Sequence, residues 1–230
     1  NTGVALQIDT SQNSTFLGEV STTNTKLKAI AASNTDTAVD VFVYDTRKDS
    51  DGGAWRKRTQ NTSWYNETLN TSTRGARKEF PCVAVIVIQN TKLTIYDGDD
   101  PDMPMWIVFD TNAQDMLGGH TSAGGSWLGS VTALNGDIAV GSYSGHAPYL
   151  FAVNFVSEKG RMWHYTAGKY CYSGDISTRN DGLGMYVQDS SASIVYLYCR
   201  DVAMTVLPNA PIDADTGLPV PTIAVATNGG

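Results

Sequence analysis

The chain has 230 residues, of which 41 % are hydrophobic, so it is long and apolar enough for one large domain with a buried core. Its net charge of −7 argues against a general phosphate-binding surface, because nucleic-acid affinity depends largely on clustered Lys and Arg. No apolar run approaches the ~20 residues of a membrane-spanning helix. We therefore expect neither nucleic acid nor a membrane as a partner.

The first 25 residues are expected to form a separate β segment and linker. Two short alternating stretches, ALQID at 5–9 and TFLGEV at 15–20, flank a polar turn. Such alternation of apolar and polar residues is typical of strands. Residues 26–230 then make up the body of the chain.

Apolar segments recur in this body with a period of ~44 residues. The segments WIVFDT, LFAVNF and IVYLYC begin at Trp106, Leu150 and Ile194, and each follows a partner strand and a polar turn. A further copy, FVYDT, begins at Phe42. Short antiparallel strands with a period of ~40–45 residues are typical of β-propeller blades. We predict an all-β, propeller-like array of short antiparallel sheets, a partial ring or fragment; a β-sandwich or jelly roll is the alternative.

Three stretches of the body carry further predictions. The polar segment 59–79 interrupts it and is expected to be an excursion on one face, where functional insertions commonly lie. The segment SVTALNGDIAVGSYSG at 130–145 predicts a hairpin around an Asn-Gly turn. The final TIAVATNGG at 222–230 resembles the first strand of another unit, so we expect the repeats to be truncated at the C-terminal end.

Three aromatic residues are candidates for glycan contact: Trp64, Tyr65 and Trp127. They lie among Asn, Thr and Gly, and exposed aromatic rings in such surroundings stack on sugar rings while the polar groups bind hydroxyls. The alternative is that each Trp fills the seam between neighbouring sheets.

The segment YDGDDPDMP is a candidate site for Ca²⁺. It concentrates Asp97, Asp99, Asp100 and Asp102, and hard cations bind several carboxylate and carbonyl oxygens. The alternative is an acidic turn that faces water. We expect no other cofactor.

No catalytic residue is assigned. The chain has no G-x-S-x-G nucleophile motif, and a sequence alone cannot pair the two carboxylates that a glycosidase needs. The stretch 48–59, KDSDGGAWRKRT, resembles a degenerate Asp-box, a structural turn of sialidase-type propellers. We expect a chain that is not an enzyme, and a glycan-active hydrolase of sialidase or glycosidase type is the alternative.

Several segments resemble proteins of marine bacteriophages. ALQIDTSQNSTFLGEV is similar to short β repeats in distal regions of their tail fibres. GAWRKRTQNTSWYNETLNTSTRGARKEFPCVAVIVI, LTIYDGDDPDMPMWIVFD and DVAMTVLPNAPIDADTGLPVPTIAVATNGG resemble large virion structural or tail-fibre proteins with propeller-like domains. The likeness covers nearly the whole chain and brings no catalytic motif.

This resemblance implies a tail fibre or tail-associated component of the virion, an extracellular particle. Its expected partners are other virion proteins or further copies of itself, together with glycans of the host surface. A cellular adhesin or surface-fibre protein is a further alternative.

Overall fold

The computed structural model describes residues 5–8, 14–17, 38–119, 124–145 and 149–229. The chain is all-β and its strands form several antiparallel sheets, so the predicted fold class is confirmed. The few helices in these ranges are short, and none is long and apolar enough to cross a membrane.

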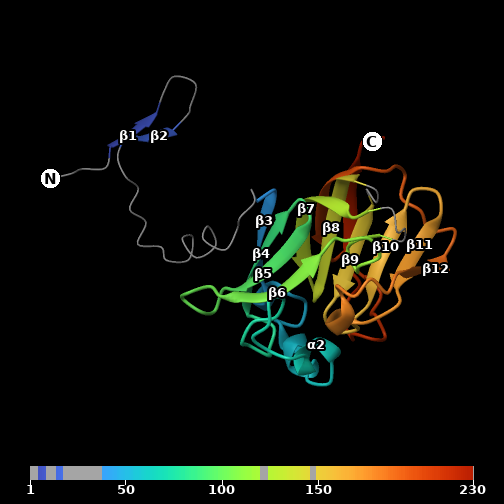
Figure 1. Cartoon of the computed structure of the whole chain (residues 1–230), viewed down its shortest axis with the longest axis horizontal. Coiled ribbons are helices and arrows are strands. Elements are labelled where there is room, and N and C mark those ends of the chain that lie inside the picture. The colour runs from blue at the N-terminus through green and yellow to red at the C-terminus, as the bar shows by residue number, and fades with distance from the viewer. Residues whose placement is uncertain (1–4, 9–13, 18–37, 120–123, 146–148, 230) are drawn as a thin grey trace.

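The first sheet is an antiparallel meander of consecutive strands (Figure 1). The sequence VAVIVIQ of its second strand is apolar almost throughout, and nearly all of these side chains are buried, as expected for a strand covered on both faces. The segment that begins at Phe42 lies in its first strand, as predicted. The strands are, in order, β3 (Asp40–Asp45), β4 (Val83–Gln89), β5 (Lys92–Asp97) and β6 (Met105–Asp110).

The second sheet is a longer antiparallel meander. Its first two strands meet at Asn135 and Gly136, whose φ angles of 56° and 77° fit the left-handed conformation of a two-residue hairpin turn. The hairpin predicted there is confirmed. The strands are, in order, β7 (Ser126–Leu134), β8 (Asp137–Gly145), β9 (Leu150–Asn154), β10 (Gly160–His164), β11 (Gly168–Tyr172) and β12 (Met185–Asp189).

Within the part of the chain that the structure describes, the third sheet consists of the strands β13 (Cys199–Thr205) and β14 (Thr222–Thr227). The predicted strand in TIAVATNGG is therefore real, but its partner is β13, which precedes it in the chain. The interpretation of this segment as the first strand of a new unit is therefore wrong, because the segment is the second strand of a pair.

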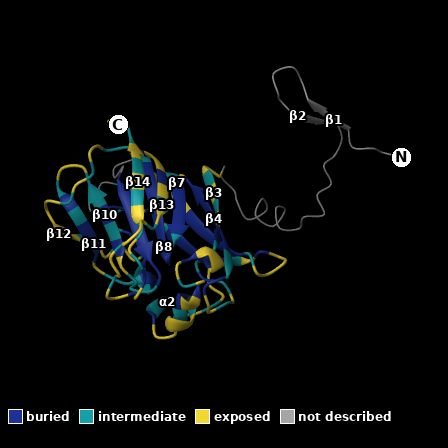
Figure 2. Ribbon diagram, turned by 180° about the vertical axis from the view of Figure 1, so that it is seen from behind, coloured by how far each residue is buried: buried dark blue, intermediate teal, exposed yellow. Residues whose placement is uncertain are grey.

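The second sheet lies between the other two. Successive side chains of a strand point to opposite faces, and on β9 Phe151 joins the large core shared with the first sheet, whereas Leu150 joins a small cluster under the third sheet. The first strands of the three sheets are neighbours, with β7 beside both β3 and β13. Seen from behind in Figure 2, β13 and β14 lie in front of β7 and β8.

The ~44-residue repeat does not place its three segments in equivalent positions. The segments at Trp106 and Leu150 lie in β6 and β9, the last strand of one sheet and the third of the next. The segment at Ile194 is a strand only from Cys199, and its Val195 is 82 % exposed. The physical reason is that β11 and β12 extend the second sheet, so residues 194–198 serve as the connection to the third.

Short helices connect the strands, mostly between β3 and β4. They are η1 (Thr46–Lys48), η2 (Ala54–Arg58), α2 (Ser63–Asn66) and, after β11, η3 (Ile176–Thr178). Near the N-terminus, β1 (Ala5–Ile8) and β2 (Ser14–Leu17) form the predicted antiparallel pair.

Candidate functional site

Trp64 does not present a face for sugar stacking, because its side chain is fully buried. It packs edge-on against Trp106 and Phe155, with ring centroids 5.4 and 5.7 Å away, and its indole N–H donates to the carbonyl of Phe155 at 2.9 Å. The alternative interpretation, a tryptophan that fills the seam between sheets, describes this residue. The surrounding insertion 59–79 is thus anchored in the core at this point.

The other two aromatic candidates differ in exposure. Tyr65 is half-buried against the core, and the ammonium of Lys78 lies 5.5 Å from its ring centroid. Trp127, on β7, is 46 % exposed. Of the three candidates, only Trp127 is placed with a large part of its side chain in water, and it remains the candidate for glycan contact.

The acidic loop after β5 is organised around an arginine. Arg77 lies 2.9 Å from a carboxylate oxygen of Asp97 and 2.8 Å from one of Asp99. Asp99 also accepts hydrogen bonds from the backbone N–H groups of Cys82 and Val83. Partial burial raises the pKa of Asp99, but these hydrogen bonds and Arg77 outweigh it and bring the pKa below its usual value.

The other two aspartates of this loop, Asp100 and Asp102, are linked by a turn in which the Asp102 N–H donates to the Asp100 carboxylate at 2.9 Å. Within the described ranges, no group of three or more His, Cys, Asp or Glu side chains is arranged to hold a metal ion. The Ca²⁺ site therefore stays a prediction, and in this structure Arg77 supplies the positive charge beside Asp97 and Asp99.

The stretch that resembles an Asp-box begins at the last residue of η1 and contains η2, and it does not form a hairpin turn. Its Asp49 accepts hydrogen bonds from the Tyr44 hydroxyl at 2.6 Å and the Trp55 indole at 2.7 Å. The same carboxylate accepts from the N–H of Asn135 at 2.8 Å, and the N–H of Gly136 donates to the Tyr44 hydroxyl. Burial raises the pKa of Tyr44 well above its usual value. This network joins the first sheet to the β7–β8 turn.

Two arginines are buried around one glutamate, an arrangement that no local sequence pattern indicates. Arg179 donates to both carboxylate oxygens of Glu67, at 3.0 and 2.9 Å, and Arg74 approaches the same carboxylate to 3.7 Å. Both guanidinium groups also donate to backbone carbonyls, including that of Trp106. Burial lowers the pKa of Arg74 to about 10. This buried cluster holds the insertion, β6 and the loop after η3 together.

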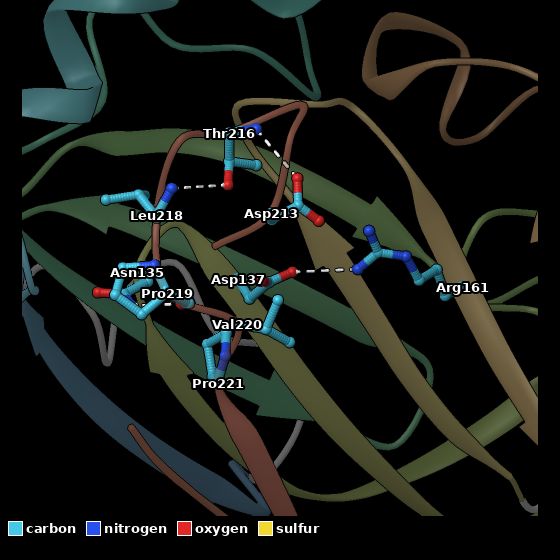
Figure 3. A pocket seen from close by; sticks show the side chains of 9 residues that line it. All are labelled: Asn135, Asp137, Arg161, Asp213, Thr216, Leu218, Pro219, Val220 and Pro221. Atoms are coloured by element: carbon cyan, nitrogen blue, oxygen red, sulfur yellow. Dashed lines mark hydrogen bonds and ion pairs between the residues drawn. The ribbon is translucent and has the colours of Figure 1, made fainter. Parts of the chain in front are cut away.

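A small polar cavity of about 30 Å³ lies between the β7–β8 turn, β10 and the connection that leads to β14 (Figure 3). Asp137 is 9 % exposed, and no described residue forms a hydrogen bond with its Oδ1, although Arg161 lies 3.7 Å away. Burial, with a smaller contribution from Asp213 across the cavity, raises the pKa of Asp137 to about 6, although Arg161 and a hydrogen bond with Asn154 act to lower it. The cavity has room for a water molecule but not for a sugar ring.

Sequence patterns predicted neither the cavity nor the buried cluster, because the residues that form each of them are far apart in the chain. Asp137 follows a recognisable turn, but nothing near it points to Arg161 or Asp213. Comparison of the chain with protein-family models, with curated proteins and with solved structures found no match to any of them.

Proposed function

We propose that this chain is a structural component of a bacteriophage tail fibre or tail-associated assembly, and that it contacts glycans of the host surface. Two findings support the proposal. The quoted segments resemble virion proteins, and the chain folds into stacked sheets whose charged residues are used to join one sheet to the next. Such a body is suited to a rigid building block.

The observation that carries the proposal is the state of the two outer faces of this stack. On the first sheet, Val41 and Val43 are 51 % and 61 % exposed, while the intervening Phe42 packs against the core. On the third sheet Ala203, Ala224 and Ala226 are exposed, small and uncharged, whereas the exposed charges of β13, Arg200 and Asp201, lie near its start. Small or apolar stretches of a sheet face suit packing against further sheets, from other virion proteins or from further copies of the chain.

The alternative of a glycan-active hydrolase requires two carboxylates beside a space that admits a sugar. Asp137 and Asp213 do share a cavity, but its volume of about 30 Å³ lies well below the ~300 Å³ of small ligand pockets. Arg161 also occupies the side of the cavity next to Asp137. This geometry favours the structural role over hydrolysis.

The experiment is to locate the chain in virus particles. An antibody against residues 38–229 is used for immunogold electron microscopy, and gradient-purified infectious particles are analysed by mass spectrometry. We expect the chain to co-purify with infectivity and the gold to lie on the tail. Detection in host cell-surface fractions, with none in purified particles, would overturn the proposal and favour a cellular adhesin.

A further inference from the structure

An exposed arginine, Arg200 at the start of β13, is held in a fixed position by uncharged neighbours. Its guanidinium carbon lies 5.8 Å from the ring centroid of Tyr143 and 5.9 Å from that of Tyr198. Its Nε donates to the side-chain oxygen of Asn228 at 2.7 Å. Two aromatic contacts and one hydrogen bond orient the group and so reduce the entropy that a ligand would have to remove.

Among the described residues Arg200 has no acidic partner, a feature that it shares with Arg56 and with no other described arginine. Among the described residues, its two terminal nitrogens make no hydrogen bond or ion pair. Arg56 bonds to backbone carbonyls instead of acids. Each of the rest pairs with a carboxylate: Arg47 with Asp45, Arg58 with Asp51, Arg74 and Arg179 with Glu67, Arg77 with Asp97 and Asp99, and Arg161 with Asp137. Because Arg200 has no acidic partner among the described residues of a chain whose net charge is −7, its guanidinium is available to bind an anion of another molecule.

Irregular backbone places both tyrosine rings. Tyr143 is skipped in the pairing of β7 with β8, where Trp127 faces Ser144 and Leu128 faces Ser142, so it is the extra residue of a β-bulge. Gly129 leaves room for its ring, since a Cβ there would lie 2.7 Å from the ring carbon Cδ1.

Tyr198 has a φ of 65°, in the left-handed region that a bulky side chain rarely adopts. Strained conformations of this kind are unfavourable and concentrate at binding sites. The two tyrosines that flank Arg200 are thus both positioned by departures from regular strand geometry.

We propose that Arg200, flanked by Tyr143 and Tyr198, binds the carboxylate of an acidic sugar residue; this inference deepens the proposed glycan contact and rests on it. The free edge of a guanidinium matches a carboxylate with two parallel hydrogen bonds. The amide of Asn90, exposed and within 3.2 Å of the Tyr143 hydroxyl, supplies a group for sugar hydroxyls. Trp127, whose cross-strand partner Ser144 directly follows Tyr143, adds an exposed ring on the same pair of strands.

The test measures binding of the intact chain to immobilised oligosaccharides. The probes are oligomers of mannuronate, guluronate, glucuronate, galacturonate and sialate, each with its carboxyl-reduced neutral form, and one sulfated galactan. We expect binding to at least one carboxylated probe and at least tenfold weaker binding to its reduced form. Arg200→Met should abolish this binding, and Arg200→Lys, which keeps the charge but loses the paired hydrogen bonds, should weaken it at least fivefold.

The matched control is Arg47→Met, which removes the same charge from an exposed arginine that already pairs with Asp45. It should bind as the wild type does. Circular dichroism and the thermal midpoint establish that each variant is folded, and Arg200→Lys provides the result if Arg200→Met is not. Binding to no carboxylated probe, equal binding to the reduced forms, preference for the sulfated probe, or unchanged binding by the Arg200 variants would overturn the inference.

The two proposals can fail separately. Binding of carboxylated probes that depends on Arg200, in a chain absent from purified particles, would support the site and overturn the virion role. A chain present in particles that binds none of the probes would do the reverse.

Discussion

The two seams on either side of the second sheet are built differently. Between the first and second sheets lies a large aromatic core that includes Trp55, Trp64 and Trp106, bordered by ion pairs with many hydrogen bonds. Between the second and third sheets, the buried cluster consists of Leu150, Cys199 and Val202, with a few partly buried neighbours. The connection that leads to β14 borders the polar cavity, where Oδ1 of Asp137 has no hydrogen-bond partner among the described residues.

Because the seams differ, we expect the third sheet to be less stable than the rest of the body. A two-stranded sheet is marginal alone and depends on what it packs against, and free energies of local opening follow the apolar area and hydrogen bonding that each unit buries. The third sheet should therefore open without the rest of the body. By contrast, the first seam should open only when the whole body unfolds.

The strongest way to break the first seam is Glu67→Gln. The variant leaves Arg74 and Arg179 buried without a counter-charge, and removal of one partner of a buried ion pair costs about 3–5 kcal/mol. Chemical denaturation should show this loss in the global free energy of unfolding. The control Glu79→Gln, at an exposed position nearby, should change it by less than about 0.5 kcal/mol. A loss at Glu67 below about 1 kcal/mol would contradict the assigned importance of the cluster.

The polar part of the second seam should respond to pH through Asp137. In the folded chain its pKa is about 6, against 3.8 in the absence of structure, so the folded state holds a proton that the unfolded state releases. The contribution of Asp137 to the free energy of unfolding is greatest below pH 3.8. It falls as the pH rises to about 6, by roughly 3 kcal/mol at most.

Asp137→Asn removes this dependence. The free energy of unfolding of the variant, relative to the wild type, should rise by roughly 1–3 kcal/mol between pH 4 and pH 7. The groups that face Asp137 are Arg161, Asn154 and Asp213, and all stay in place. Asp115, whose pKa is also raised to about 6, is present in both proteins and cancels in the difference. A constant difference across this range would show that Asp137 does not titrate as described.

The same substitution on either side of the second sheet compares the seams directly. Val140 of β8 lies in the large core and Val202 of β13 in the small cluster, and both are buried. Val140→Ala should lower the global free energy of unfolding by about 1–3 kcal/mol. Val202→Ala should lower by about 1–2 kcal/mol only the local opening free energy of amides in β13 and β14, measured by hydrogen exchange. Equal effects of both on β4 and β9 would contradict separate seams.

Cysteine labelling gives the smallest and most local signal. Cys82 is half-buried, whereas Cys171 and Cys199 are buried, and burial raises the pKa of Cys199 to about 11. A thiol reagent should modify Cys82 first, and mass spectrometry should find Cys199 labelled only as the third sheet opens. Val202→Ala should accelerate labelling of Cys199 by roughly 5–30-fold and leave Cys171 unchanged. Equal acceleration at both would mean that the second and third sheets open together.

Local chemistry predicted much of the fold. Alternating residues and recurring short apolar segments predicted strands, and the turn at Asn135 and Gly136 follows from residues that adopt positive φ. For Trp64 the sequence left two interpretations open, glycan contact and burial in the seam between sheets, because its sequence neighbours are mostly polar and the rings that cover it come from Trp106 and Phe155. The spacing of Trp106 and Leu150 is real, but equal spacing does not fix the order of strands within a sheet.

The sequence did not predict the surroundings of Arg200 or the buried cluster around Glu67, again because the contacting residues are distant in the chain. In the sequence Arg200 is an ordinary charged residue of a strand. Only the structure shows that it contacts Tyr143, Tyr198 and Asn228. Likewise, Glu67 and Arg179 are separated by 112 residues, a distance over which no periodicity connects them. Burial and pairing of charges are decided by contacts between distant segments, so they become visible only once the strands are placed.

The network around Asp49 sets an order of events during synthesis. Its carboxylate bonds to an N–H that lies 86 residues later, and the Tyr44 hydroxyl accepts from one 92 residues later. The first sheet can therefore form as a meander while the ribosome is still translating, but it cannot complete its packing until the β7–β8 turn has emerged. Closing such a long loop slows folding and leaves apolar strands exposed in the meantime, when they can aggregate with those of other chains.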